Sequence, residues 1–230
     1  MKGSLLMLSL LLVPPLTASG AEAPQHPKLP VIEVPVPAGT TSDTLVVFVS
    51  GDGGWAKIDK QISSVLAATG MPVVGLNALQ YFWTRKTPEA AAGDLQYLIE
   101  TYMTSWRKSR LLLIGYSRGA DVLPLMVSRL PAELRAKVRL LALLGLSPSV
   151  ELEFHVTDWV HNAKGGYPVR PEVEKLRGMP ILCVYGEEDK GTLCPSLAGA
   201  PGIDIVALKG AHHFDGGYGN VGRIILDHLR

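Results

Sequence analysis

Residues 111–119 read Leu-Leu-Leu-Ile-Gly-Tyr-Ser-Arg-Gly, an apolar run that leads directly into a G-x-S-x-G pattern. A short, continuously apolar run is typical of a strand whose two faces are both covered. The serine then falls on a tight turn between that strand and a following helix, where its hydroxyl stands clear of the backbone. Gly115 and Gly119 remove side chains that would collide in such a turn. The stretch therefore predicts Ser117 as a catalytic nucleophile.

Similar apolar runs recur on both sides of this stretch and alternate with segments of helical periodicity. Such alternation predicts an α/β fold with a mostly parallel sheet and helices on both faces. The segment Glu151–Arg170 breaks the rhythm, so we expect a loop or a minimal cap over the carboxyl edge of the sheet. The other expected strands are residues 45–49, 72–76, 138–144, 181–185 and 203–208, and the expected helices are residues 58–66, 87–106, 117–129 and 221–229.

The composition excludes several classes of protein. The chain has 230 residues, of which 47% are hydrophobic and 19% charged, so it can bury a core and is not disordered. The formal net charge is +1, so the chain lacks the excess of basic residues that is typical of nucleic-acid-binding proteins. We therefore expect no nucleic-acid partner. With only two cysteines, the chain is neither a disulfide-stapled miniprotein nor the holder of a four-thiolate zinc site.

The N-terminus has the pattern of an export signal. One lysine precedes a short apolar core, Pro14-Pro15 ends it, and small residues follow. We therefore expect a signal peptide at residues 1–21, a Pro-rich leader or edge strand at 22–40, and the hydrolase domain at 41–230. Export predicts a periplasmic protein, in which Cys183 and Cys194 either form a disulfide or stay as buried thiols.

Two partners for the serine should follow it in the order acid, then histidine. The fifth expected strand ends in a carboxylate-rich loop, where Asp189 is the preferred acid and Glu188 its competitor. The sixth is followed by a tandem histidine pair, of which we prefer His213 as the general base because Phe214 could pack it in place. His212 is the alternative. The pair lacks further ligands at metal-binding spacing, so we expect no metal and no cofactor.

The oxyanion formed during ester hydrolysis needs two backbone amides. One should belong to Arg118, directly after the nucleophile. The other should come from the glycine-rich turn after the first expected strand, from Asp52 or else from Gly53. No lysine-plus-hydroxyl signature follows that turn, which argues against a nucleotide-binding loop.

Several motifs taken together resemble one known family. They are Ser50-Gly51-Asp52-Gly53-Gly54-Trp55, Tyr81-Phe82-Trp83, Gly115-Tyr116-Ser117, Phe154-His155-Val156 and His212-His213-Phe214-Asp215. In these the chain resembles the VirJ/AcvB-type bacterial virulence proteins. The resemblance implies a periplasmic α/β hydrolase that cleaves aminoacyl-phosphatidylglycerol, chiefly the lysyl form, at the membrane surface. It also implies a link to type IV secretion, and it gives Ser117, Asp189 and His213 the catalytic roles.

An aminoacyl ester carries an ammonium group beside its carbonyl, so its site should offer carboxylates, and lipid chains call for aromatic side chains. Three functions remain open: an aminoacyl-phospholipid hydrolase, a general esterase or thioesterase, and a non-catalytic partner of a type IV secretion apparatus. The acidic candidates are Asp52, Asp121, Glu153, Glu187 and Glu188, and the aromatic ones are Trp55, Tyr81, Phe82, Trp83 and Trp159.

Overall fold

The computed structural model describes residues 28–153 and 166–229. The expected signal peptide and Trp159 lie outside these residues. The described chain forms a seven-stranded sheet in the order β1-β3-β2-β4-β5-β8-β9, in which β1 is antiparallel to β3 and the other neighbours are parallel. The strands are β1 (Val31–Val34), β2 (Thr44–Val49), β3 (Val73–Leu76), β4 (Arg110–Tyr116), β5 (Val138–Leu144), β8 (Ile181–Gly186) and β9 (Ile203–Leu208).

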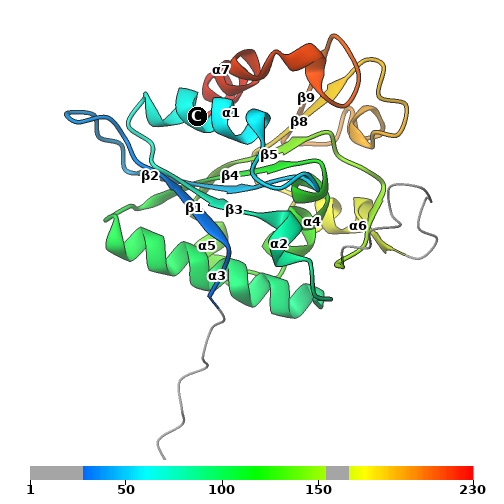
Figure 1. Cartoon of the computed structure of the whole chain (residues 1–230). Helices are drawn as coiled ribbons and strands as arrows, with labels where there is room; N and C mark the ends of the chain where they lie inside the picture. Colours follow the sequence, from blue (N-terminus) through cyan, green and yellow to red (C-terminus); the bar gives the residue numbers. More distant parts are fainter. Residues whose placement is uncertain (1–27, 154–165, 230) are drawn as a thin grey trace, which may run out of the picture.

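Helices cover both faces of the sheet, as the alternating pattern predicts (Figure 1). α1 and α7 lie on one face, and α3, α4 and α6 lie on the other. The strands β6 (Ser149–Val150) and β7 (Tyr167–Pro168) pair antiparallel at the two ends of the segment expected to form a loop or minimal cap, and residues 154–165 of that segment lie outside the described residues. The helices are α1 (Lys57–Ala67), α2 (Ala78–Tyr81), α3 (Pro88–Ser105), α4 (Arg118–Val127), α5 (Ala132–Arg135), α6 (Arg170–Glu174) and α7 (Tyr218–His228), with 3₁₀ turns η2 (Cys194–Leu197) and η3 (Phe214–Gly216).

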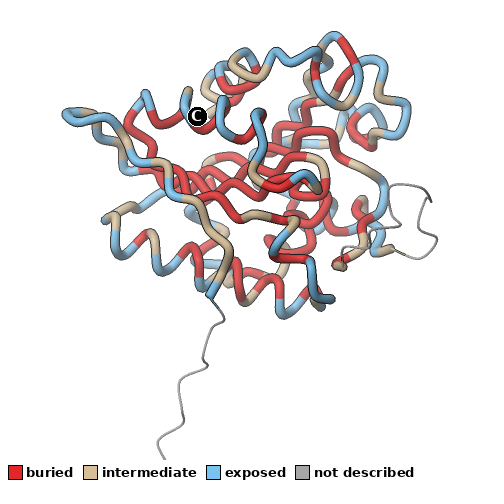
Figure 2. The backbone as a smooth tube through the Cα atoms, viewed as in Figure 1, coloured by how far each residue is buried: buried red, intermediate tan, exposed pale blue. Residues whose placement is uncertain are grey.

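The apolar run at the centre of the sheet supplies both halves of the core. Successive side chains of a strand point to opposite faces. Leu112 and Ile114 accordingly pack with the α1–α7 side, while Leu111 and Leu113 pack with the α3–α4 side. Figure 2 shows the central strands buried along their length. Burial on both faces is the reason that these strands appear in the sequence as unbroken apolar runs.

Local signals set the helix boundaries. The Thr87 hydroxyl accepts a hydrogen bond from the Ala90 amide (3.1 Å), and Pro88 occupies the first turn of α3. A threonine cap followed by proline is a favoured start for a helix. The start that the sequence predicts for this helix is therefore confirmed.

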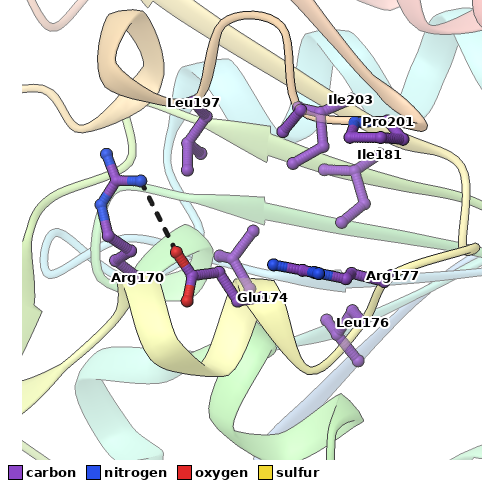
Figure 3. A pocket seen from close by; sticks show the side chains of 10 residues that line it. Arg170, Glu174, Leu176, Arg177, Ile181, Leu197, Pro201 and Ile203 are labelled. Carbon is purple, nitrogen blue, oxygen red and sulfur yellow. Dashed lines mark ion pairs between the residues drawn. The ribbon is translucent and has the colours of Figure 1, made fainter.

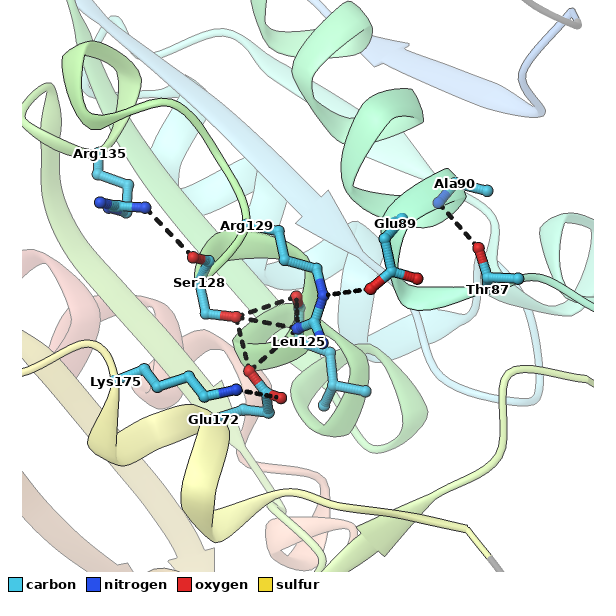
Figure 4. A network of polar contacts seen from close by, with 9 residues as sticks. All are labelled: Thr87, Glu89, Ala90, Leu125, Ser128, Arg129, Arg135, Glu172 and Lys175. Atoms are coloured by element: carbon cyan, nitrogen blue, oxygen red, sulfur yellow. Dashed lines mark hydrogen bonds and ion pairs between the residues drawn. The ribbon is translucent and has the colours of Figure 1, made fainter.

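A polar network fastens three helices on one face of the sheet (Figure 4). The Arg129 guanidinium, just past α4, pairs with Glu89 of α3 and with Glu172 of α6, each at 3.0 Å. Glu172 also accepts hydrogen bonds from Ser128 (2.7 Å) and Lys175 (2.8 Å). Burial would raise the pKa of Glu172, but these donors hold it below its ordinary value. The helix that follows Ser117, α4, is thus braced at its far end.

Candidate active site

Ser117 lies between β4 and α4 in a backbone conformation that non-glycine residues rarely adopt. Its φ is 53° and its ψ is −123°, and α4 begins at the next residue. Such strained conformations cluster at functional sites because the surrounding fold has to enforce them. This geometry is the strand-to-helix elbow that presents a nucleophilic serine in α/β hydrolases.

The two glycines of the motif make the elbow possible. A Cβ atom on Gly115 would overlap the backbone carbonyl of Gly119. A Cβ atom on Gly119 would overlap the carbonyl of Val49 in β2. The elbow therefore packs against its own helix and against the neighbouring strand, at distances that only glycine allows.

The acid and the histidine come from the loops after β8 and β9. Asp189 follows β8, and its Oδ2 lies 2.7 Å from Nδ1 of His212. Its Oδ1 accepts a hydrogen bond from the Gly191 amide (3.2 Å). A carboxylate in this position holds the imidazole in one tautomer and supports its positive charge.

The structure places His212, and not the preferred His213, in contact with Asp189. The Nδ1 of His213 lies 2.7 Å from the Tyr116 hydroxyl. The His212 ring instead occupies the space left at Gly145, where a Cβ atom would come within 2.7 Å of the ring. Phe214, which was expected to hold His213, is buried in the core on the α1–α7 side. Neighbouring loop residues point in different directions, and the sequence carries no signal for which one faces the acid.

One open cavity brings these groups together. Its volume is about 360 Å³, and its wall includes Ser117, His212 and His213. The glycine-rich turn forms another part of that wall, where Gly54 donates to the Gly51 carbonyl (3.0 Å) and Asp52 and Gly53 lie between them. A Cβ atom on Gly51 would lie 3.2 Å from that of Ser117, so the turn sits directly beside the nucleophile. Arg118, Asp52 and Gly53 thus remain the candidates for the oxyanion amides.

The Arg118 side chain ties this turn to the segment that follows β6. The guanidinium is buried, and its Nε pairs with the Asp52 carboxylate. Its Nη1 donates to the carbonyls of Glu151 (2.7 Å) and Glu153 (3.1 Å). The charge of Asp52 is therefore balanced within the fold.

The other carboxylates proposed for substrate binding also have partners or lie elsewhere. Asp121 is buried and accepts a hydrogen bond from the Ser147 amide (2.6 Å), and burial raises its pKa to about 7. Glu153 pairs with Arg85 at 2.8 Å. Glu187 and Glu188 are exposed in the loop that carries Asp189. None of these four is among the residues that line the cavity.

The aromatic candidates are placed mainly by core packing. Trp55 meets Phe48 edge to face, with ring centroids 5.6 Å apart, and lies over Gly75. Tyr81 and Phe82 are buried, and the Tyr81 hydroxyl donates to Asp94 at 2.6 Å. Trp83 is 62% exposed. No described member of this set lines the cavity beside Ser117.

The cavity wall includes side chains that the sequence did not point to. Lys57 and Asp59, in the first turn of α1, contribute to it together with Tyr116 and Tyr218. Tyr116 stands inside the G-x-S-x-G motif and could have been noticed there. Asp59 shows no sequence signal beyond that of an acidic residue in a first helical turn.

Cys183 and Cys194 form a disulfide, one of the two alternatives that the sequence left open. Their Cα atoms are 5.7 Å apart, and both residues are fully buried. The bond joins β8 to η2 and encloses the loop that carries Asp189. The loop is also held by the Leu193 amide, which donates to the Leu146 carbonyl (2.7 Å). The acid is therefore presented by a covalently closed loop.

A second cavity, of about 230 Å³, lies between α6, η2 and the start of β9 (Figure 3). It is lined mainly by apolar side chains, with Arg170 paired to Glu174 at its rim. It contains none of the predicted catalytic residues. Among residues 28–153 and 166–229, the structure has no cluster of His, Cys, Asp or Glu that could hold a metal ion, and no helix long and apolar enough to cross a membrane.

Comparison with solved structures supports the fold. Est1E from Butyrivibrio proteoclasticus superimposes with a TM-score of 0.63 at 14% identity, covering 86% of this chain and 93% of that one. The esterase domain of a Rhodothermus marinus protein gives 0.60 at 16% identity, covering 85% and 95%. A serine hydrolase homologue from Coxiella burnetii gives 0.59 at 16% identity, covering 87% and 91%. These likenesses establish an α/β-hydrolase fold.

Sequence comparison addresses the family. A comparison with curated proteins gives no significant match. The family model described as bacterial virulence protein (VirJ) matches residues 43–230, which is most of the chain and includes every strand of the large sheet except β1. The chain therefore belongs to the VirJ family of bacterial virulence proteins.

Proposed function

We propose that this protein is a serine hydrolase in which Ser117 is the nucleophile, His212 the general base and Asp189 the acid that orients it. One observation carries the proposal: His212, which contacts Asp189 at 2.7 Å, lines the same cavity as a serine on a strained elbow. A binding protein would not need a strained serine, an acid and a histidine engaged by that acid in this chain order. The chemistry that this arrangement suits is acyl transfer.

The steps follow from the positions of these groups. His212 takes the Ser117 proton on Nε2 as the serine oxygen attacks the ester carbonyl. Throughout this step, the Nδ1–H of His212 donates a hydrogen bond to the Asp189 carboxylate. Backbone amides of Arg118 and of the Asp52–Gly53 turn receive the oxyanion, helped by the positive end of α4. His212 then passes the proton to the departing alcohol, leaving an acyl-serine. In the second half of the reaction, His212 takes a proton from water as the water attacks the acyl group. The acyl group then leaves as the free carboxylic acid, and Ser117 regains its proton from His212.

The proposed substrate is the aminoacyl ester of aminoacyl-phosphatidylglycerol, with lysine or alanine as the amino acid. Membership of the VirJ family and the motif resemblance support this choice. Cleavage would release the amino acid and leave phosphatidylglycerol. The proposed location is the periplasm, reached by the signal peptide at residues 1–21, where the enzyme would meet its lipid at the membrane surface.

Amino acid release from vesicles tests the proposal. Vesicles that contain lysyl- or alanyl-phosphatidylglycerol would be incubated with the wild type and with three variants. Ser117→Ala and His212→Ala should each lower the release rate by at least about 1,000-fold, because each removes a member of the triad. His213→Ala is the matched control, and we expect it to keep the rate within about tenfold because His213 does not contact the acid.

The other outcomes separate the remaining functions. Cleavage of small soluble esters, but of neither lipid, would leave a general esterase or thioesterase. A folded protein that cleaves no ester would favour a non-catalytic partner of a type IV secretion apparatus. Full activity of Ser117→Ala would contradict the triad itself.

A further inference from the structure

The α1 side of the active-site cavity contains a carboxylate that the proposed triad does not use. Asp59 forms part of the cavity wall, and its side chain has no exposed surface. Its Oδ2 accepts a hydrogen bond from the Ala56 amide (2.8 Å), which caps α1. Its Oδ1 has no hydrogen-bond partner in the described part of the chain. Since a buried polar atom without a partner is costly, it calls for a specific reason.

The charges around the cavity make Asp59 distinctive. Asp52, the other carboxylate in the wall, is balanced by Arg118, and the nearby acid Asp189 is engaged by His212. Lys57 also borders the cavity, but it is exposed, and water screens its charge. The cavity therefore has one carboxylate in its wall whose charge no side chain in that wall pairs at close range.

The surroundings of Asp59 suit a cation. The rings of Tyr116 and Tyr218 contribute to the same wall, and aromatic faces attract ammonium groups. Burial weakens solvent screening, so a carboxylate here attracts an entering cation more strongly than it would at the surface. Because the Asp59 side chain has no exposed surface, it acts on such a cation through its electric field across the cavity wall rather than through a direct hydrogen bond.

We propose that the α1 side of this cavity is a subsite for a cationic group on the acyl portion of the ester, and that Asp59 determines this specificity. The inference rests on the proposed ester hydrolysis at Ser117. It replaces the carboxylates suggested by the sequence, none of which combines a place in the cavity wall with an oxygen left without a partner. An aminoacyl group fits such a subsite because its ammonium is attached to the α-carbon, directly beside the reacting carbonyl.

A pair of nearly isosteric esters tests the subsite. Alanine ethyl ester and ethyl isobutyrate have the same leaving alcohol and differ by an ammonium in place of a methyl group. In Asp59→Asn the amide oxygen can still cap α1, but the charge is gone. We expect kcat/KM for the alanine ester to fall by about 10- to 100-fold, mainly through KM, while that for the isobutyrate changes by less than about twofold.

Two further variants serve as controls. Asp227→Asn removes one negative charge near the far end of α7 and should change neither ester. Ser63→Ala removes the other buried oxygen without a partner on α1, and it should not alter the preference between the esters. An equal loss on both esters in Asp59→Asn, or no loss on the alanine ester, would overturn the inference and leave the proposed hydrolysis standing.

Binding separates the two proposals if the wild type cleaves neither small ester. Alanine ethyl ester would be titrated into Ser117→Ala, with and without Asp59→Asn, and followed by NMR. Weaker binding with the second substitution would support the subsite even where the proposed hydrolysis fails. Equal binding, or no binding to either form, would overturn the subsite.

Discussion

Asp59 and Asp121 are carboxylic acids buried on helices that cover opposite faces of the sheet. Each accepts one backbone hydrogen bond, from Ala56 and from Ser147 respectively. Burial penalises the charged form and raises the pKa of Asp59 to about 6 and that of Asp121 to about 7. At the residue scale, the burial of these two carboxylic acids around Ser117 thus costs electrostatic free energy, which apolar side chains at the same positions would not.

Asp59 makes the stability of the fold depend on pH. The folded protein holds this proton more tightly than the unfolded chain, so the stabilisation is present below about pH 4 and is lost as pH rises to about 6. Asp59→Asn removes this dependence. Its free energy of unfolding, relative to wild type, should rise by about 3 kcal/mol between pH 4 and pH 7.5 in urea titrations. A difference that stays constant over this range would show that the pKa of Asp59 is not raised in the folded state.

At the element scale, the loop between β8 and η2 presents the acid to the histidine. The Cys183–Cys194 disulfide closes this loop across 11 residues, and the Leu193 amide fastens it to the Leu146 carbonyl. Similarly, the elbow between β4 and α4 is braced by the polar network around Arg129 at the far end of its helix. The loop after β8 and the elbow before α4, which carry the site residues, are therefore both held in place by contacts outside the site.

Replacing both cysteines by alanine should loosen the loop that carries Asp189. Opening a loop of this length should lower the free energy of unfolding by up to about 3 kcal/mol, since the unfolded chain regains conformational freedom. We expect kcat for ester hydrolysis to fall as well, because the Asp189–His212 contact becomes less well ordered. Wild-type protein treated with a reductant is the control for the lost side-chain volume. An unchanged urea midpoint in both samples would argue against this role of the bond.

On the scale of the whole molecule, the sequence predicts the sheet well and the site in part. The apolar runs predict the central strands because burial on both faces leaves no alternation to obscure them. The Gly115–Gly119 motif predicts the elbow because any larger residue at either glycine position would place its Cβ atom inside neighbouring backbone. Which of His212 and His213 faces Asp189, by contrast, depends on the space at Gly145, a residue distant in the chain. The place of Asp59 in the cavity wall likewise depends on packing between α1 and the loops around it.

The central claim is that Ser117 is a nucleophile activated by His212 rather than by His213. Its most direct test is covalent labelling by a fluorophosphonate, followed by intact mass spectrometry and peptide mapping, because it needs no knowledge of the substrate. The account predicts a single adduct on Ser117 that is absent in Ser117→Ala, strongly slowed in His212→Ala and retained in His213→Ala. Labelling that is lost in His213→Ala but kept in His212→Ala, or no labelling of folded wild-type protein, would contradict it.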